Sequence, residues 1–371
     1  MRILVSGAGT AGLSAGIDLA RAGHEVEIVE RTNRLRANGS PIDVRGEAIE
    51  TARGMGILDA VRAHRITMTE QTKFVDRSGA AVAPLVLQEI NETPDDIELP
   101  REDLMAILRQ TLPEQVELRF EERVVTLVDD GDRVAVTFAS GREAAYDLVV
   151  GADGAHSAVR RLVFGEEKEF TEHLGVYVAI GDVPGQTAPG TARVTEILNL
   201  PGRFAGVARY RDKALGIFEF RSEPIDYDHH DLGAQKRILA EAFAGIEDWK
   251  VPELVKTVLA DPNLYFDVLA QIIMPAWHKG RVVLIGDAAH CATPMAGRGV
   301  SLALLGAWTL TEELDRHGDD LESAFAAYEQ RHRPHAAAAQ EFARGGADLM
   351  VPATWEAIEA RNTRLRAAQP L

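Results

Sequence analysis

The chain has 371 residues, a formal charge of −17 and a single cysteine, Cys291. Its length allows about two domains, and its acidity argues against nucleic acid or anionic membranes as partners, because both bind positive surfaces. One cysteine excludes internal disulfides and cysteine-rich zinc sites. No apolar run reaches the roughly 18 residues that a membrane span needs, so we expect a cytoplasmic protein.

The first thirty residues predict a complete βαβ unit. Residues 2–6 and 25–30 are expected to form strands, and the alanine-rich stretch 11–22 a helix that ends before Gly23. The elements that we expect next are helices over 47–63 and 99–112, a hairpin over 67–87, and short strands over 116–128, 133–139 and 143–150.

The pattern then changes to consecutive strands with turns between them, which is typical of an antiparallel sheet. These strands are expected over 174–183, 191–200, 204–210 and 215–221. Helices over 231–261, a strand over 281–285, and helix from 299 onward complete the chain. The order predicts an α/β fold in which a nucleotide-binding part is interrupted by insertions that form a β-rich part.

A glycine-rich turn follows the first strand. Gly7, Gly9 and Gly12 form the pattern G-x-G-x-x-G before a helix, and Glu30 ends the next strand. Such glycines allow a tight turn and close approach of a pyrophosphate, and an acid at that place accepts hydrogen bonds from an adenosine ribose. Strand, helix, strand and acid occur in the required order, which indicates dinucleotide binding rather than a purely structural turn.

A second strand-to-helix connection lies at 146–163, with Asp153 in its turn. Ser157 is placed to cap the following helix, and Arg160 and Arg161 bring positive charge to its first turns. The same residues also suit an ordinary connection that binds nothing.

The stretch "GDAAHCATPMAGRGVSLAL", 286–304, repeats the strand, turn and helix of the first motif some 280 residues later. Asp287 ends a strand, Pro294 shapes the turn, and the amides from Gly297 to Val300 open a helix whose positive end favours negative charge on a bound group. We infer that the first and third turns hold the two ends of one long ligand.

These three motifs together resemble the class A flavin-dependent monooxygenases, the group typified by para-hydroxybenzoate hydroxylase. Residues 1–335 carry the resemblance, and "NGSPIDVRGEAIETARGMGIL" is most similar to the tetracycline-inactivating and polyketide-hydroxylating members. The resemblance implies a Rossmann-like FAD-binding domain, an interleaved β-rich substrate domain and a C-terminal helix. The expected segments are 1–66, 97–165 and 276–335 for FAD, 67–96 and 166–275 for substrate, and 336–371 for a helical brace across both.

The resemblance also implies which residues bind the cofactor. The adenosine end of FAD is expected at the first motif, and the pyrophosphate and ribityl portion near Asp287. The whole expected set is Gly7, Gly9, Gly12, Glu30, Arg31, Arg36, Arg101, Asp153, Arg160, Asp287, Pro294, Gly297 and Gly299. Within this set Asp153 and Arg160 are tied to both FAD and NAD(P)H. Arg45 shares the loop of Arg36 beside the flavin ring, and no catalytic residue is expected beyond those next to the flavin.

The implied reaction begins with transient reduction of the flavin by NAD(P)H. Oxygen then adds to form a flavin C4a-hydroperoxide, which transfers one oxygen atom to an aromatic or polyketide-like small molecule and in this way could inactivate an antibiotic. The alternatives are an FAD-dependent reductase or dehydrogenase without oxygen transfer, and a non-catalytic flavin-fold binding protein. A flavin halogenase is disfavoured because the chain has no W-x-W motif.

Several positions leave alternatives open. Arg298 and Ser301 stand where the family has Gln and Asn, so Arg298 either charges the flavin site or points to solvent. His290 fits hydrogen bonding or packing better than general-base catalysis, and a solvated loop explains His229 and His230 better than a metal site, so no metal is expected. The candidates for substrate binding are the aromatic residues Tyr177, Tyr210, Phe218 and Phe220, although half of such residues should face away and pack.

Overall fold

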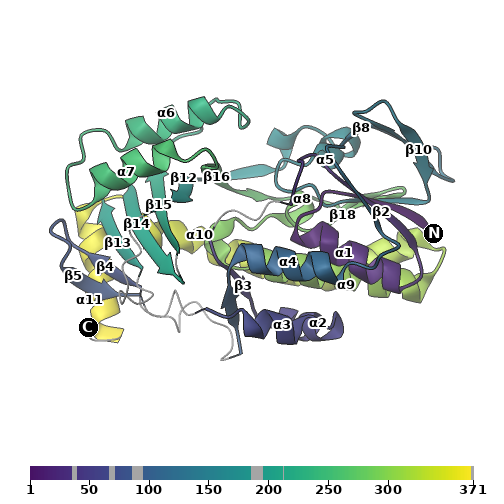
Figure 1. Ribbon diagram of the computed structural model, residues 1–371, viewed down its shortest axis with the longest axis horizontal. Coiled ribbons are helices and arrows are strands. Elements are labelled where there is room, and N and C mark those ends of the chain that lie inside the picture. The colour runs from purple at the N-terminus through teal and green to yellow at the C-terminus, as the bar shows by residue number, and fades with distance from the viewer. Residues whose placement is uncertain (36–39, 67–71, 86–94, 185–194, 212, 369–371) are drawn as a thin grey trace.

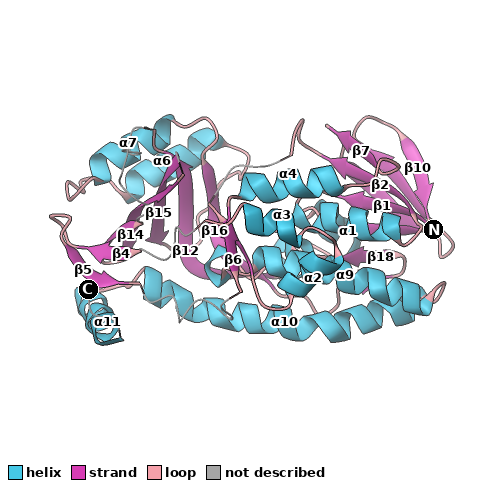
Figure 2. Ribbon diagram, turned by 60° about the horizontal axis from the view of Figure 1, so that its bottom comes forward, coloured by secondary structure: helices cyan, strands magenta, loops and turns pink. Residues whose placement is uncertain are grey.

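The computed structural model describes residues 1–35, 40–66, 72–85, 95–184, 195–211 and 213–368. Two sheets of different construction stand at opposite ends of the long axis of the molecule (Figure 1), and in the view of Figure 2 a long helix runs below both. Arg36 lies outside the described residues.

The first sheet has six strands and is parallel except at one edge. Its order is β17 (His278–Lys279), β18 (Val282–Leu284), β11 (Leu148–Gly151), β1 (Arg2–Ser6), β2 (Glu25–Glu30) and β7 (Glu117–Phe120). The inner strands β1, β11 and β18 are almost wholly buried, as parallel strands covered on both faces must be. The predicted βαβ unit at the N-terminus is confirmed.

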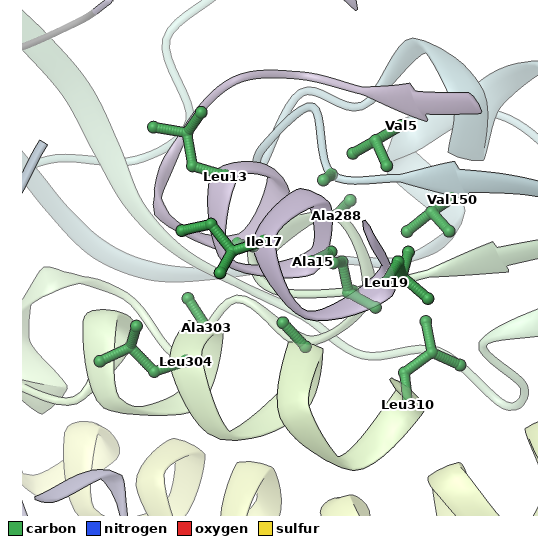
Figure 3. Close-up of a cluster of buried hydrophobic side chains, with 14 of the residues drawn as sticks. Val5, Leu13, Ala15, Ile17, Leu19, Val150, Ala288, Ala303, Leu304 and Leu310 are labelled. Atoms are coloured by element: carbon green, nitrogen blue, oxygen red, sulfur yellow. The ribbon is translucent and has the colours of Figure 1, made fainter. Parts of the chain in front are cut away.

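Seven helices in the described part of the chain contribute apolar residues to the core around the first sheet or extend it. They are α1 (Thr10–Arg21), α2 (Ala48–Gly54), α3 (Leu58–Ala63), α4 (Arg101–Thr111), α5 (Ala158–Val163), α8 (Asp287–His290) and α9 (Gly299–His317). The apolar faces of α1 and α9 meet, with Leu13 and Ile17 above Ala303 and Leu304 (Figure 3). This contact fixes the N-terminal ends of the two helices that follow the first and third motifs.

Two small sheets extend this half of the molecule. One consists of β8 (Val124–Asp129), β9 (Val134–Phe138) and β10 (Glu143–Tyr146), and the other of β3 (Ile42–Val44) and β6 (Ile97–Leu99). The single strand expected over 116–128 is wrong, because Glu121 takes a positive φ of 57° and divides it into β7 and β8. These two strands belong to different sheets.

The second sheet has seven strands, antiparallel except where β13 meets β4. Its order is β16 (Tyr265–Ile272), β12 (Thr171–Asp182), β15 (Lys213–Arg221), β14 (Arg203–Tyr210), β13 (Glu196–Leu200), β4 (Lys73–Val75) and β5 (Ala81–Pro84). Helices α6 (Leu232–Ala242) and α7 (Val251–Ala260) pack on one face. The predicted antiparallel region is confirmed, and β16 is an eight-residue strand that the sequence did not predict.

The C-terminal region corrects one expectation. The helix that spans the molecule is α10 (Leu321–Met350), which packs along α9 and also reaches β12, as Figure 2 shows. The last helix, α11 (Trp355–Ala368), contacts β5 and β13 at the far end instead. The brace therefore begins before residue 336, and the boundary expected there falls inside one continuous helix. The division of the chain into domains stays a prediction.

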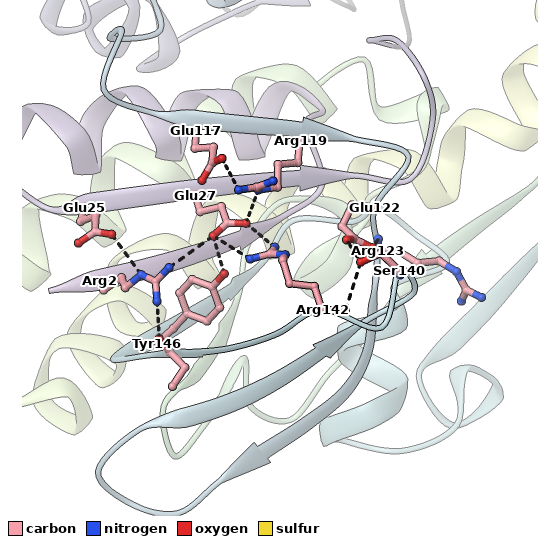
Figure 4. A network of polar contacts seen from close by, with 11 residues as sticks. Arg2, Glu25, Glu27, Glu117, Arg119, Glu122, Arg123, Ser140, Arg142 and Tyr146 are labelled. Carbon is pink, nitrogen blue, oxygen red and sulfur yellow. Dashed lines mark hydrogen bonds and ion pairs between the residues drawn. The ribbon is translucent and has the colours of Figure 1, made fainter.

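A buried acid on β2 links this strand to its neighbours. The Glu27 carboxylate lies 3.1 Å from the Arg119 Nε and 2.6 Å from the Tyr146 hydroxyl, which donates to it, and Arg2 and Arg142 also surround it (Figure 4). Glu27 is only 5% exposed. Burial, followed by the hydrogen bond to Glu27, raises the pKa of Tyr146 to about 12. The network ties β2 to β1, β7 and β10.

Candidate functional site: a dinucleotide groove

The three motifs meet at one edge of the six-stranded sheet. Strands β1, β11 and β18 are parallel neighbours, and Ser6 pairs with Gly151, which pairs in turn with Leu284. Each motif begins where one of these strands ends, so all three turns lie at the carboxyl edge. Open α/β sheets bind their ligands in the crevice at this edge, which we call the groove.

The glycines of the first turn serve two purposes. A Cβ on Gly7 would lie 2.4 Å from the Ala152 carbonyl oxygen, and one on Gly12 would lie 1.9 Å from the Gly7 carbonyl oxygen, so both positions need glycine for packing. Gly9 differs, because a Cβ there would meet nothing within 4 Å. Gly9 also precedes α1 without a side-chain cap, which leaves the helix amides directed at open space. That combination fits a pyrophosphate.

Glu30 is held in place at the end of β2. Its Oε2 accepts a hydrogen bond from the Ala8 amide at 2.9 Å, and its Oε1 accepts one from the Thr32 amide at 3.0 Å. The side chain stays partly exposed. A fixed carboxylate beside the glycine turn suits a ribose diol, as the sequence predicts. Arg31, the next residue, is exposed.

The polar side chains of the second motif form hydrogen bonds within the chain. Asp153 Oδ2 accepts hydrogen bonds from the Ala158 and Val159 amides at 2.8 and 3.1 Å, and Ser157 caps α5 as predicted. Arg160 is fully buried and donates to the Ala288 carbonyl at 3.0 Å. In this structure Asp153 holds the start of α5, and Arg160 fastens the second motif to the third. The contact of both residues with FAD or NAD(P)H stays a prediction.

The third motif presents its polar groups to the groove. Asp287 is exposed there although the next three residues of α8 are buried. The protein walls around it raise the pKa of the Asp287 carboxyl, and the nearby Arg101 guanidinium at the start of α4 opposes that shift. The structure therefore brings together Asp287 and Arg101, two predicted cofactor residues that are 186 positions apart in the sequence. Pro294 and Gly299 are exposed at the same groove.

Positive charge gathers at the start of α9. Arg45 is buried, with its guanidinium 2.9 Å from Asp43 Oδ2, and the Gly297 Cβ position lies 3.8 Å from Arg45 Cζ. The helix has no side-chain cap at Arg298. Burial and then the charge of Arg45 lower the pKa of Arg298, so the two cations lie near each other. Asp43 neutralises Arg45 in part, so Arg298 and the helix start supply most of the positive charge that favours an anion here.

Ser301 has a structural role at the start of α9. Its hydroxyl accepts a hydrogen bond from the Arg45 amide at 2.9 Å and donates to the Asp43 carbonyl at 3.2 Å. It thus fastens β3 to α9 and holds Arg45 at the helix start.

Thr293 is a feature of the site that the sequence did not reveal. This buried residue takes φ 73° and ψ 152°, a conformation that is nearly confined to glycine and costs about 1–3 kcal/mol. It immediately precedes Pro294. Strain of this kind gathers at ligand sites, where surrounding structure enforces it.

The groove has what FAD needs: an open glycine cradle, a fixed acid at one end and an uncapped, positively charged helix start at the other. A family model described as an FAD binding domain matches residues 1–343. The chain belongs to the FAD-dependent monooxygenases of class A. Its relatives include a flavin-dependent monooxygenase of Legionella longbeachae, 32% identical over 92% of this chain and 87% of that protein.

Two further proteins match most or nearly all of this monooxygenase. An uncharacterised protein of Mycobacterium tuberculosis is 39% identical over 88% of both chains. The crystal structure of the tetracycline destructase Tet(51) matches with a TM-score of 0.84 and 31% identity, over 99% of this chain and 96% of that one. The monooxygenase is an FAD enzyme, and none of its described helices is both long and apolar enough to cross a membrane.

The aromatic residues expected to bind substrate divide between the two faces of the second sheet. Tyr177, Phe218 and Phe220 are at most 2% exposed and pack with Phe243 beneath α6 and α7. They lie in the core on the helix-covered face, so the packing interpretation holds for these three. Tyr210 lies in the apolar cluster of the other face.

His290 also packs inside the monooxygenase. It is 2% exposed, its ring lies 4.7 Å from the rings of both Trp277 and His332, and burial lowers its pKa to about 3. A neutral histidine in the core fits the packing interpretation rather than a general base in the groove.

His156 in the second motif makes stability depend on pH. Hydrogen bonds to Asp267 at 3.4 Å and to Glu167 at 2.8 Å raise its pKa from 6.5 to about 9. A raised pKa stabilises the folded state fully below pH 6.5, and that stabilisation is lost as pH rises toward 9. We expect at most about 3 kcal/mol from this group. The free energy of unfolding, measured with urea at pH 6.5 and pH 9.5, should include this contribution at the lower pH and lack it at the higher.

The matched variant is His156→Gln. It should lower the free energy of unfolding at pH 6.5 and change it little at pH 9.5. A difference between wild type and variant that is the same at both pH values would show that the charge of His156 contributes nothing.

Proposed function

We propose that this monooxygenase uses NAD(P)H and O2 to hydroxylate an aromatic or polyketide-like small molecule. The observation that carries the proposal is the pairing of an open dinucleotide groove with an uncapped, cationic helix start at Gly297–Gly299. The first feature suits the nucleotide half of FAD and the second suits the flavin half. We further propose that the enzyme acts in the cytoplasm, where NAD(P)H is supplied.

Bound FAD supplies the chemistry: it takes electrons from NAD(P)H, activates O2 and delivers one oxygen atom to the substrate. The chain supplies position and charge. Gly9 and the α1 amides would hold the pyrophosphate, and Glu30 the adenosine ribose. Arg101 and Asp287 would hold the ribityl portion.

The start of α9 has a separate task. Arg45, Arg298 and the helix amides would stabilise negative charge on the reduced ring. Pro294 would limit the space on its substrate side and exclude water there. Ser301 would act only as a positioning residue, because its hydrogen bonds are with the chain itself, and Thr293 would shape the turn through its backbone conformation.

The panel of candidate substrates follows from the relatives. Tetracyclines belong in it because Tet(51), named a tetracycline destructase, shares 31% identity with this chain. Other polyketides and simple phenols complete it. The test is to measure NAD(P)H oxidation with each compound under 18O2 and to follow the product by mass. Stimulated oxidation with one 18O atom in the product supports the proposal.

A reductase or dehydrogenase without oxygen transfer is the second candidate. It would oxidise NAD(P)H in step with a substrate whose product contains no 18O, and it would work without O2. That outcome would exclude hydroxylation as the function.

The charge at α9 gives a prediction about the cofactor. Replacing Arg298 with Gln removes one cation beside the expected flavin ring, so the midpoint potential should fall by about 30–50 mV, or ~1.4–2.3 kcal/mol for two electrons. Spectroelectrochemical titration measures this. Arg237→Gln is the control, because Arg237 is exposed on α6. Equal potentials in wild type and Arg298→Gln would mean that Arg298 points away from the flavin.

A further inference from the structure

The second sheet has another face, opposite α6 and α7, against which the end of α10 and part of α11 pack. Its apolar cluster includes Val178, Ile180 and Phe204. Met295, which follows Pro294 in the third motif, packs against this cluster, as does Met350 at the end of α10. The face therefore adjoins the loop expected beside the flavin, and in Figure 1 the end of α10 lies beside it. We call it the inner face.

Two acids flank Val178 on the inner face: Glu219 of β15, and Asp267 of β16, which accepts a hydrogen bond from His156 at 3.4 Å. Glu219 of β15 is directly opposite Val178 on β12 and Phe204 on β14, and residues directly opposite in an antiparallel pair share a face. Its neighbours along β15, Phe218 and Phe220, point to the helix-covered face instead. Glu219 thus stands among apolar neighbours on its own and the adjacent strands.

The Glu219 carboxyl has no internal partner among the described residues. Its Oε2 is buried and forms no hydrogen bond, and burial alone raises the pKa of the carboxyl to about 7, with no contribution from a neighbouring charge. By contrast Arg221, two residues along the same face, is satisfied by the Val351 carbonyl and by Asp348.

A buried polar group without a partner destabilises a fold, so such groups need an explanation, and a ligand that completes the hydrogen bonds is one. The side chain is only partly buried, so a ligand can reach it. A mainly apolar wall with a few polar groups is also the usual construction of a small-molecule site.

We propose that Glu219 is a specificity-determining residue that accepts a hydrogen bond from a hydroxyl or protonated amine on an otherwise apolar, ring-shaped substrate. This inference rests on the proposed function. The acceptor would orient the substrate by its donor group, while the apolar residues of the inner face contact the ring. A ligand without the donor would leave the carboxyl unpartnered and bind more weakly.

The test measures binding to the oxidised FAD enzyme by the change in flavin absorbance, so that it needs no turnover. The probes are 1-naphthol, 1-naphthylmethylamine and 1-methoxynaphthalene, which share a ring and differ in the donor. Wild type should bind at least one donor probe about tenfold or more tightly than the methyl ether. Glu219→Gln should lose that preference, and the two donor probes tell whether hydroxyl or ammonium is recognised.

Stability provides a second, independent readout. Because the carboxyl is buried without a partner, Glu219→Gln should leave Tm unchanged or raise it by about 1–3 °C. Glu223→Gln is the matched control, since Glu223 is exposed four residues further along the chain and should change neither Tm nor probe affinity.

Three results would overturn the inference: a methyl ether bound as tightly as both donor probes, a preference that survives in Glu219→Gln, or a Tm that falls in this variant by several degrees. If no probe binds, the Tm comparison decides. Failure of 18O incorporation with intact donor preference would instead refute the hydroxylation and leave the role of Glu219 standing.

Discussion

Gly9→Ala should yield a folded protein that has lost its FAD. A methyl group at Gly9 meets no protein atom within 4 Å, and the φ of −74° suits alanine, so the Tm of the apoprotein should not change. The same methyl group would occupy the space expected for the pyrophosphate. We expect the Kd for FAD to rise by at least tenfold, or about 1.4 kcal/mol, in a fluorescence titration.

Gly12→Ala is the matched variant, and it should lower the stability of the apoprotein as well as the affinity for FAD. Its Cβ would lie 1.9 Å from the Gly7 carbonyl oxygen, so the turn itself must move. Both the Tm of the apoprotein and the affinity for FAD should fall. If instead Gly9→Ala bound FAD as wild type does, the cofactor would not cross this turn, and the dinucleotide interpretation of the first motif would be wrong.

Glu27→Gln should destabilise the apoprotein strongly without touching the groove. The carboxylate is buried and compensates the charges of Arg2, Arg119 and Arg142. The substitution takes the carboxylate partner from Arg142, whereas the partly exposed Arg2 and Arg119 keep Glu25 and Glu117, so we expect a cost of about 2–3 kcal/mol. Urea unfolding of the apoprotein measures the change in the free energy of unfolding.

Glu25→Gln is the control on the same strand. Glu25 also pairs with Arg2, at 3.1 Å, but its side chain is 73% exposed, so its loss should cost less than about 1 kcal/mol. If the two variants lost equal stability, burial would not be what makes the Glu27 network strong. Neither residue lies at the groove, so both variants should bind FAD as the wild type does.

The groove could be predicted well from the sequence because its chemistry is local. The glycine turn, Glu30 and the stretch after Asp287 each follow a strand, and parallel strands bring their carboxyl ends to one edge. The position of each motif on its own strand was therefore enough to predict that they meet. The cap formed by Ser157 was equally local and is confirmed.

Less of the substrate side could be predicted, because position there depends on contacts distant in the chain. Strand β16 was missed because its residues alternate only loosely, and its pairing with β12 holds it in place. Which face each aromatic residue takes depends on where α6 and α7 pack. Glu219 left one signal, an acid between Phe218 and Phe220 in a strand whose interior is otherwise apolar, but only the sheet shows which side it faces.

A crystal structure of the FAD complex would test most directly whether one extended FAD lies along this groove. We expect the adenosine at Gly7–Gly12 and Glu30, and the flavin ring over the start of α9 between Pro294 and Gly299, with the inner face of the second sheet on its open side. A flavin ring remote from Pro294 and Gly299, or an adenosine away from Glu30, would contradict this placement and the oxygen chemistry that depends on it.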